Sequence, residues 1–312
     1  MAIKKLPSTG DAPRNTGVPE SLVPGGAADS AGFPWEGRTF DHHGTAFAGD
    51  DGSTPELVAR AVAALREAAD EAKRAGVGAG SGSASGSETD AARERALAAV
   101  AAAHDVVICA LRESRVLVPM LAEAGDLGVT PEGKTVEKTQ ELSIVTVGAP
   151  DGRRVLPVFT STATLAHWHP EARPIPVPCG QAALAAVQEE TDLMILDAAT
   201  AEREYGIRRP ALKALALGET YVPAWADAEV IGAFRAGASG EPAIVGVELA
   251  PGDIDARLLA PEVDVLIRLA GGLTREDLDG LLQRLQARWA ASEIIAERVD
   301  SMRVRPVAAG GA

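Results

Sequence analysis

The stretch TQELSIVTVGAPDGRRVLPVFT, residues 139 to 160, carries the strongest fold signal in the chain. Apolar residues crowd both sides of the tetrapeptide Ala149-Pro150-Asp151-Gly152. In such a turn, proline presets φ, aspartate can hydrogen-bond its own backbone, and glycine accepts a positive φ. We therefore predict a β-hairpin that turns at these four residues.

Short helices and strands are expected on both sides of this hairpin. Ser161 and Thr162 can cap a short helix that ends near Trp168, where Pro170 stops it. The other predicted elements are helices at 53–75, 87–111, 181–190 and 209–217, strands at 115–120, 173–178 and 192–196, and a polar loop at 122–137. The strand at 173–178 is expected at a sheet edge, because its prolines cannot donate to a ladder. Alternating strands and helices predict an α+β fold, a mixed sheet with flanking helices.

A second, smaller α/β unit is predicted near the C-terminus. Its elements are helices at 229–235 and 274–289 and strands at 243–249, 263–269 and 299–307, an order that suits a ferredoxin-like sandwich. The second helix is the clearest in the chain: Thr274 caps it, and one apolar face holds Leu278, Leu281, Leu282, Leu285 and Trp289.

Three segments have the composition of disordered chain. Residues 1–52 lack a sustained apolar period, and 308–312 form a short tail. Within the first segment, Trp35 and Phe40 can either dock on the folded domain as a strap or serve as a short motif for a partner. Residues 76–87, GVGAGSGSASGS, predict a flexible linker; no strand precedes it and no Lys-Ser or Lys-Thr closes it, so the phosphate-loop interpretation fails.

The hairpin, the capped helix, the proline-rich strand and the elements through Leu196 together resemble the SseB family of bacteria. The sequence Trp-Glu-Gly-Arg-Thr-Phe at 35–40 is also similar to a stretch before the first helix in that family. The resemblance covers residues 35 to 306, interrupted at 76–87. It implies an SseB N-terminal-type domain at 53–217, a linker at 218–228, and an SseB C-terminal-type domain at 229–307. It implies no mechanism, because the family has no agreed biochemical activity.

Charge and cysteine content narrow the classes of function. The net charge of −14 disfavours binding to nucleic acid or to an anionic membrane surface. The arginine pairs 153–154 and 208–209 are interpreted as solvated surface. The two cysteines lie far apart, and neither a signal peptide nor a membrane-length apolar run is evident. We expect a cytoplasmic protein, although the sequence leaves open an export route without a cleaved signal peptide.

Chemical motifs are weak throughout. His167, His169 and Cys179 are types of residue that bind zinc, but their spacing places the two histidines far apart on a helix, and we expect no metal and no cofactor. The strand end before the capped helix offers a weaker hypothesis, a helix N-terminus that holds a small anion, with ordinary capping as the simpler interpretation. We predict no catalytic residue. The residues retained as candidates for ligand or partner contact are Trp35, Phe40, Phe159, Thr160, Ser161, Thr162 and Trp168.

Two functions from different classes remain open. The first is a non-enzymatic adaptor that presents surfaces to another protein. The second is a sensor of a small molecule such as an amino acid, in which a homodimer through the C-terminal domain would fit; an enzyme of unknown type comes third. A free apolar face on the helix at 274–289 would favour the adaptor.

Overall fold

The computed structural model describes residues 47–77, 87–124, 127–129, 135–137, 140–149, 152–189 and 191–308. Residues Asp50–Ala312 belong to one compact unit. The predictions about Trp35, Phe40, most of the glycine-serine linker and the tail at 309–312 lie outside the described residues. The division into domains at 218–228 stays a prediction.

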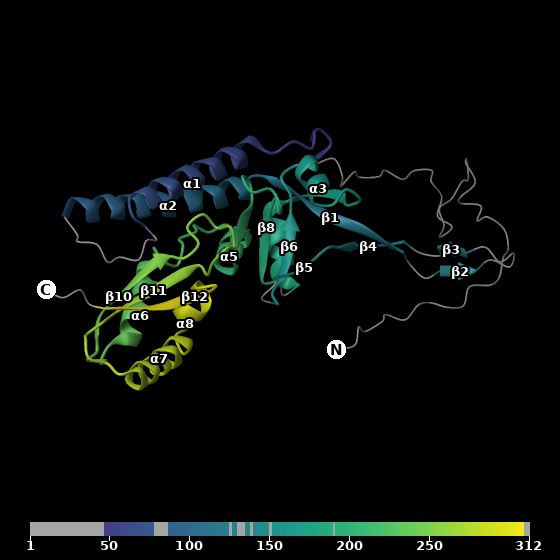
Figure 1. Cartoon of the computed structure of the whole chain (residues 1–312). Helices are drawn as coiled ribbons and strands as arrows, with labels where there is room; N and C mark the ends of the chain where they lie inside the picture. The colour runs from purple at the N-terminus through teal and green to yellow at the C-terminus, as the bar shows by residue number, and fades with distance from the viewer. Residues whose placement is uncertain are drawn as a thin grey trace. The chain divides into compact units, whose positions relative to one another are not determined.

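Two long helices lie side by side at the start of this unit (Figure 1). They are α1 (Glu56–Arg74) and α2 (Ser87–Arg112). The stripe of α1 that packs inward includes Val58, Ala61, Val62 and Leu65, whereas Leu57 is 54% exposed. In α2, Val107 is fully buried while its neighbour Val106 is 53% exposed, so the segment is helical as predicted and not a strand.

The first sheet has the order β4-β1-β7, from β1 (Arg115–Ala124), β4 (Gln140–Ile144) and β7 (Arg173–Pro178). The N–H of Cys179 donates to the carbonyl of Ser114 at 3.0 Å. Because N–H groups alternate in direction along a strand, the outward positions of β7 are those occupied by proline, at 174, 176 and 178. This confirms the edge strand, and it leaves those positions without an N–H that another strand could bind.

The second sheet has the order β5-β6-β8-β9. Its strands are β5 (Val147–Gly148), β6 (Arg154–Val158), β8 (Leu193–Leu196) and β9 (Tyr205–Ile207). The predicted hairpin joins β5 to β6, with Val147 opposite Val155 and the N–H of Gly152 donating to Ala149. It is shorter than predicted, because β4 turns away to pair with β1.

Strands β6 and β8 run parallel. The connection between them passes through α3 (Thr162–Trp168), β7 and α4 (Cys179–Gln188). Helices α4 and α5 (Arg209–Leu217) pack on one face of this sheet. The predicted loop at 122–137 is wrong in part, since it contains the paired strands β2 (Leu127–Val129) and β3 (Thr135–Glu137). Strand β9 is a further element that was not predicted.

The third sheet, β10-β11-β12, is formed by β10 (Ile244–Pro251), β11 (Val263–Leu269) and β12 (Met302–Ala308). It packs with α6 (Ala228–Ala238), α7 (Arg275–Ala290) and α8 (Glu293–Arg298). A ferredoxin-like motif has the order β-α-β-β-α-β. The unit described here has the predicted order of helix, strand, strand, helix and strand, with the short helix α8 added before β12 and no strand before α6 in this sheet.

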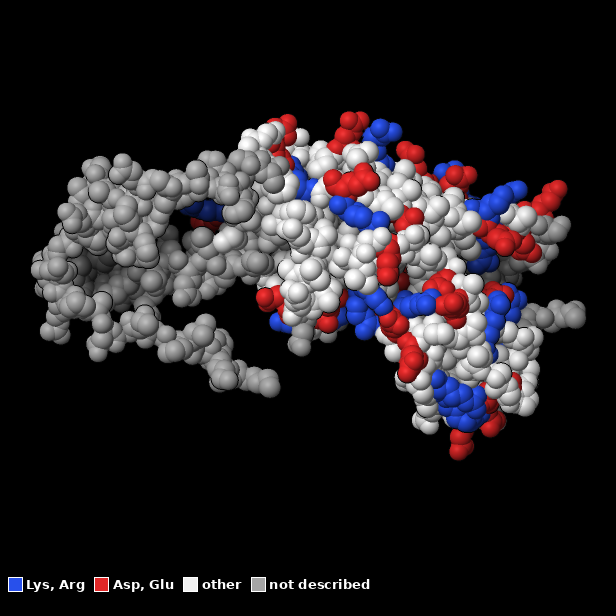
Figure 2. Space-filling model, turned by 180° about the vertical axis from the view of Figure 1, so that it is seen from behind, with Lys and Arg blue, Asp and Glu red and all other residues white. Residues whose placement is uncertain are grey.

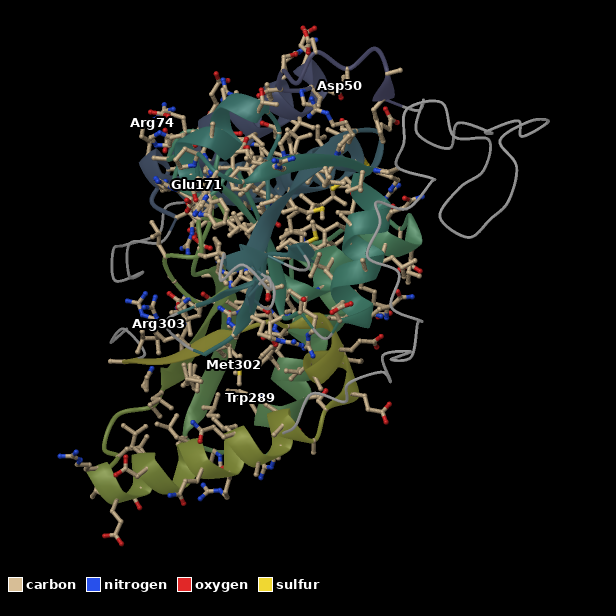
Figure 3. The ribbon with its side chains drawn as sticks, turned by 90° about the vertical axis from the view of Figure 1, so that its right-hand side faces the viewer. Asp50, Arg74, Glu171, Trp289, Met302 and Arg303 are labelled. Carbon is tan, nitrogen blue, oxygen red and sulfur yellow. The ribbon has the colours of Figure 1, made fainter. Side chains whose placement is uncertain are left out.

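The apolar face of α7 packs inside the chain. Trp289 is 1% exposed, lies 5.1 Å from the ring of Phe234, and donates its Nε1–H to the Phe234 carbonyl at 3.1 Å (Figure 3). A Cβ at Gly237 would lie 2.6 Å from the Trp289 ring, so only glycine fits there. Leu281 and Leu285 are buried as well, while Leu278 and Leu282 are half-buried, so the chain itself covers most of this face.

The surface mixes both signs of charge. On the face drawn in Figure 2, acidic and basic side chains are interspersed rather than gathered by sign. No helix among the described residues combines the length and the apolar character needed to cross a membrane.

A buried ionic network joins the second and third sheets. Arg208, which is 4% exposed, donates to Asp253 at 2.6 Å, to Asp300 at 3.0 Å, and to the carbonyl of Ala260 at 2.8 Å. Arg153 donates to the same Asp300 oxygen at 3.0 Å. The expectation that the arginines here are solvated surface is therefore wrong for Arg208, whose two partners come from sequence positions far downstream.

We expect Arg208→Met to lower the free energy of unfolding by about 3–5 kcal/mol, because Asp253 stays buried without a cation and Asp300 keeps only Arg153. Lys213→Met is the matched control; it removes an exposed pair with Glu297, and we expect a change of less than about 1 kcal/mol. Urea unfolding of both variants measures the difference. Equal effects would contradict a structural role for the network.

Candidate functional site

A polar cluster lies at the carboxyl ends of the parallel strands β6 and β8. Asp197 is fully buried and accepts three hydrogen bonds, from the N–H of Thr160 at 2.8 Å, its hydroxyl at 2.6 Å and the hydroxyl of Thr164 at 2.7 Å. Arg115 donates to the Thr160 carbonyl and pairs with Asp50. Every polar atom named here has a protein partner, so the cluster fastens the two strand ends together.

The same cluster begins α3. Ser161 caps the helix in a capping box with Thr164, and the N–H of Thr162 donates to the carbonyl of Gly52 at 2.9 Å. Ordinary capping, the simpler interpretation from the sequence, accounts for these contacts. Nothing in the geometry of these residues points to a bound anion.

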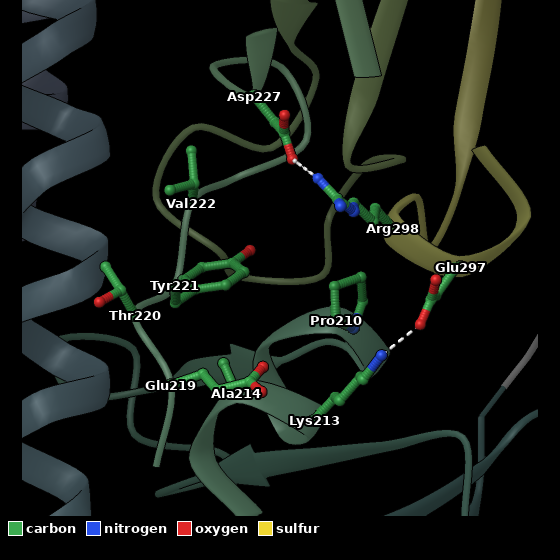
Figure 4. A pocket seen from close by; sticks show the side chains of 10 residues that line it. All are labelled: Pro210, Lys213, Ala214, Glu219, Thr220, Tyr221, Val222, Asp227, Glu297 and Arg298. Carbon is green, nitrogen blue, oxygen red and sulfur yellow. Dashed lines mark hydrogen bonds and ion pairs between the residues drawn. The ribbon is translucent and has the colours of Figure 1, made fainter. Parts of the chain in front are cut away.

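A first pocket, of about 280 Å³, lies between α5, the segment 218–227 and α8 (Figure 4). Tyr221 lines it, and burial raises the pKa of its hydroxyl well above the ordinary value. The charged side chains on its rim pair with one another: Lys213 with Glu297, and Arg298 with Asp227 at 3.0 Å. The two cations of this pocket are therefore already neutralised, and Glu219, which also lines it, adds an acidic side chain.

A second and larger pocket, of about 450 Å³, lies on the face of the second sheet opposite α4 and α5. We call it the sheet-face pocket. Its floor consists of alternate residues of β6 and β8, namely Val155, Pro157, Leu193 and Ile195. Trp168, Leu258 and the hairpin residues 147–149 form its walls. The volume falls in the range of sites for small ligands.

Three charged residues line the sheet-face pocket. Arg153 pairs with Asp300, and Glu204 accepts one hydrogen bond from the N–H of Ala199 at 3.3 Å. The guanidinium of Arg257 has no hydrogen bond or ion pair with any described residue, and its Nε is buried without a partner. An unpaired cation beside an apolar floor is the feature that separates this pocket from the first.

Two loops at the rim hold residues in the left-handed region, which is uncommon outside glycine. Asp197 has a φ of 47° and Ala199 of 65° on one side, and Ala256 has 49° and Leu258 has 57° on the other. Such strain persists only where the surroundings impose it, and it gathers at functional sites.

Hydrogen bonds to Asp253 and to β9 hold the loop that carries Arg257 in place. The carboxylate of Asp253 accepts the N–H of Arg257 at 3.1 Å and that of Leu258 at 2.9 Å, while Arg208 holds the same carboxylate. The N–H of Gly206 in β9 donates to Ala256 at 2.6 Å. A Cβ on Gly206 would lie 2.5 Å from Leu258, so glycine is required where the loop crosses the strand.

The candidate residues proposed from sequence lie at two different places in the structure. Trp168 lines the sheet-face pocket, and its ring lies 5.2 Å from that of the buried Phe159. Thr160, Ser161 and Thr162 belong to the polar cluster instead.

Sequence reasoning missed Glu204 and Arg257. No local motif marks either of them, since their importance arises from contacts with distant segments. The zinc hypothesis gains no support, because no group of three or more potential ligands occurs among the described residues.

Two buried side chains, His104 and Glu262, have pKa values that burial shifts away from the ordinary ones. Burial lowers the pKa of His104 to about 4 from 6.5. Its ring lies 3.0 Å from the carbonyl of Ile254, which can only accept, so Nε2 carries the proton and Nδ1 accepts from Tyr205 at 3.1 Å. Burial raises the pKa of Glu262 to about 7 from 4.5, although the N–H of Asp300 donates to its carboxylate at 2.8 Å.

These two groups give opposite pH dependences of stability. Glu262 binds a proton more tightly in the folded state, so its contribution is lost as pH rises from about 4.5 through about 7. His104 binds a proton less tightly when folded, so its contribution is lost as pH falls from about 6.5 through about 4. Between about pH 4.5 and 6.5, the two groups change the free energy of unfolding with pH in opposite directions.

In Glu262→Gln only the contribution of His104 remains, so we expect the free energy of unfolding to rise more steeply with pH than in wild type. In His104→Gln only the contribution of Glu262 remains, so we expect the free energy of unfolding to fall with pH relative to wild type. Each slope should differ from wild type by up to about 1.4 kcal/mol per pH unit. Urea unfolding between pH 4.5 and 6.5, the window bounded by the ordinary pKa values of the two groups, measures this. Changes of the same sign in both variants would refute it.

Comparison with known proteins gives one match. Residues 94–214 match the family model described as the SseB protein N-terminal domain. No curated protein and no solved structure matches the chain. The match covers less than half of the chain and ends within α5, so a C-terminal-type SseB domain is not confirmed. It supports the SseB family for the segment that contains the polar cluster, the floor of the sheet-face pocket and Trp168.

Proposed function

We propose that this protein is a non-enzymatic binding protein whose ligand, a small molecule, occupies the sheet-face pocket. The observation that carries the proposal is the unpaired Arg257 at an apolar pocket of about 450 Å³. Arg257 is half-buried, and its Nε is buried without a partner. A buried polar atom without a partner is costly, and a ligand that accepts from it removes this cost. We also infer that residues 229–307 are the SseB C-terminal-type domain, because they follow the matched segment and contribute the loop that carries Arg257.

The state of the reactive groups supports binding over catalysis. The hydroxyls of Thr160 and Thr164 donate to the fully buried Asp197, whose carboxylate also accepts the N–H of Thr160, so these groups hold the strand ends together. Burial raises the pKa of the Cys179 thiol to about 12, which keeps it protonated. His104 uses both ring nitrogens within the core.

Filling the pocket tests this function. Ile195→Trp places an indole over the floor, and Val245→Trp puts the same side chain on a residue that is 63% exposed in β10. In a thermal-shift screen of small apolar acids, amides and amines, we expect some compound to stabilise wild type and the control variant, by about 2.7 kcal/mol at 100 times its dissociation constant, but not Ile195→Trp. No stabilising compound, or equal shifts in all three proteins, would refute the function.

A second candidate is the protein adaptor. Burial of the α7 face removes one surface it could use, but Leu184 and Val187 are 47% and 49% exposed on α4. Ile175 of β7 is also exposed, and it lines a nearby apolar pocket of about 270 Å³. Neighbouring exposed apolar side chains are a feature of protein interfaces.

The double variant Leu184→Ser/Val187→Ser tests the adaptor in a pull-down with the full chain. We expect an adaptor to lose a stoichiometric partner in this variant but keep it in Leu217→Ser, which changes an exposed leucine of α5. A partner retained by both variants would place the interface elsewhere.

A further inference from the structure

We propose that the sheet-face pocket selects small molecules that carry one carboxylate on an apolar body, and that Arg257 holds the carboxylate. The inference rests on the proposed function, and it specifies the ligand's chemistry.

The argument for an anion begins with the partners of Arg257. Its backbone N–H donates to Asp253, but its guanidinium has no partner among the described side chains. Two other arginines of this region are paired: the buried Arg208 with Asp253 and Asp300, and the half-buried Arg66 with Asp255. Arg257 is thus the guanidinium left to bind an added anion.

The chemistry of the guanidinium indicates the kind of anion. Arg66 is already neutralised by its pairing with Asp255, so the positive charge that an added anion meets in this pocket is that of Arg257. The fork of donors on arginine matches the two oxygens of a carboxylate.

The remainder of the pocket limits the ligand. Its floor is aliphatic, with Trp168 at the side, and this suits an apolar body. Glu204 also lines the pocket and would repel a second negative charge. The net charge of −14 also repels ligands that carry several negative charges. A monocarboxylate, with or without an ammonium group, therefore fits this pocket better than a polyphosphate does.

The loop geometry explains how Arg257 is held ready. Residues on both sides of it, Ala256 and Leu258, have φ values of 49° and 57°. The Asp253 carboxylate fixes two successive N–H groups of this loop, and Arg208 fixes Asp253. A binding group on a fixed loop loses less freedom when the ligand arrives.

Four probes of the same size test the proposal by calorimetry with the full chain: 3-phenylpropanoate, its neutral amide, 3-phenylpropylamine and phenylalanine. We expect the propanoate to bind at least about tenfold more tightly than the amide, and the amine most weakly, because one charge-assisted contact is lost or reversed. Arg257→Gln should remove the preference for the acid. Arg275→Gln, the same change at an exposed position on α7, should keep it.

The outcomes separate this inference from the function on which it rests. Equal affinity for acid and amide, or a preference for the acid that survives Arg257→Gln, overturns the role of Arg257 while leaving the pocket as a binding site. Loss of all binding in Ile195→Trp then shows that the site itself is correct. If none of the four probes binds wild type, the carboxylate proposal is overturned. Tighter binding of phenylalanine than of the propanoate would assign the ammonium group to Glu204.

Discussion

The buried pairing of Arg208 with Asp253 and Asp300 is the interaction on which the arrangement of this protein depends. One guanidinium at the end of the second sheet holds a carboxylate from each of two segments that flank strands of the third sheet. Loss of this guanidinium leaves the Asp253 carboxylate buried without a cation and leaves Asp300 with Arg153 alone, and burial of an unpaired charge costs several kcal/mol. The pairing therefore does more than add stability, since it fixes how one sheet meets the other.

The sheet-face pocket is a consequence of that pairing. Asp253 uses one carboxylate to accept from Arg208 and from two backbone N–H groups of the loop that follows. These contacts hold Leu258 over Gly206, which covers part of a sheet face that would otherwise be open. They also hold the Arg257 backbone where its side chain lines the cavity. The floor comes from one segment of the chain and the charged wall from another, so neither segment contains the site alone.

This division explains what the sequence could and could not predict. The hairpin at 149–152, the helix capped by Thr274 and the proline edge strand follow from local rules, and the structure contains all three. The strand pairing of residues 140–144 with β1 was missed because pairing depends on a distant partner. The same limit applies to the site: Trp168 was named from its neighbourhood, but Arg257 and Glu204 belong to no motif. Arg208 was misread because sequence alone shows two adjacent arginines and none of their acids.

The polar cluster around Asp197 and the sheet-face pocket differ in how far the fold constrains their side chains. Around Asp197, each hydroxyl and N–H named above has a partner in the chain, so a substitution there leaves a buried group unsatisfied and destabilises the fold. At the sheet-face pocket, Arg257 contributes no ion pair to the fold, and its loop is held through backbone N–H groups that any residue except proline supplies. The identity of this side chain is thus free of the fold's requirements. Arg257 is half-buried beside an apolar floor, which costs free energy, and it adds no ion pair to the fold. A bound ligand accounts for this cation better than a contribution to stability does.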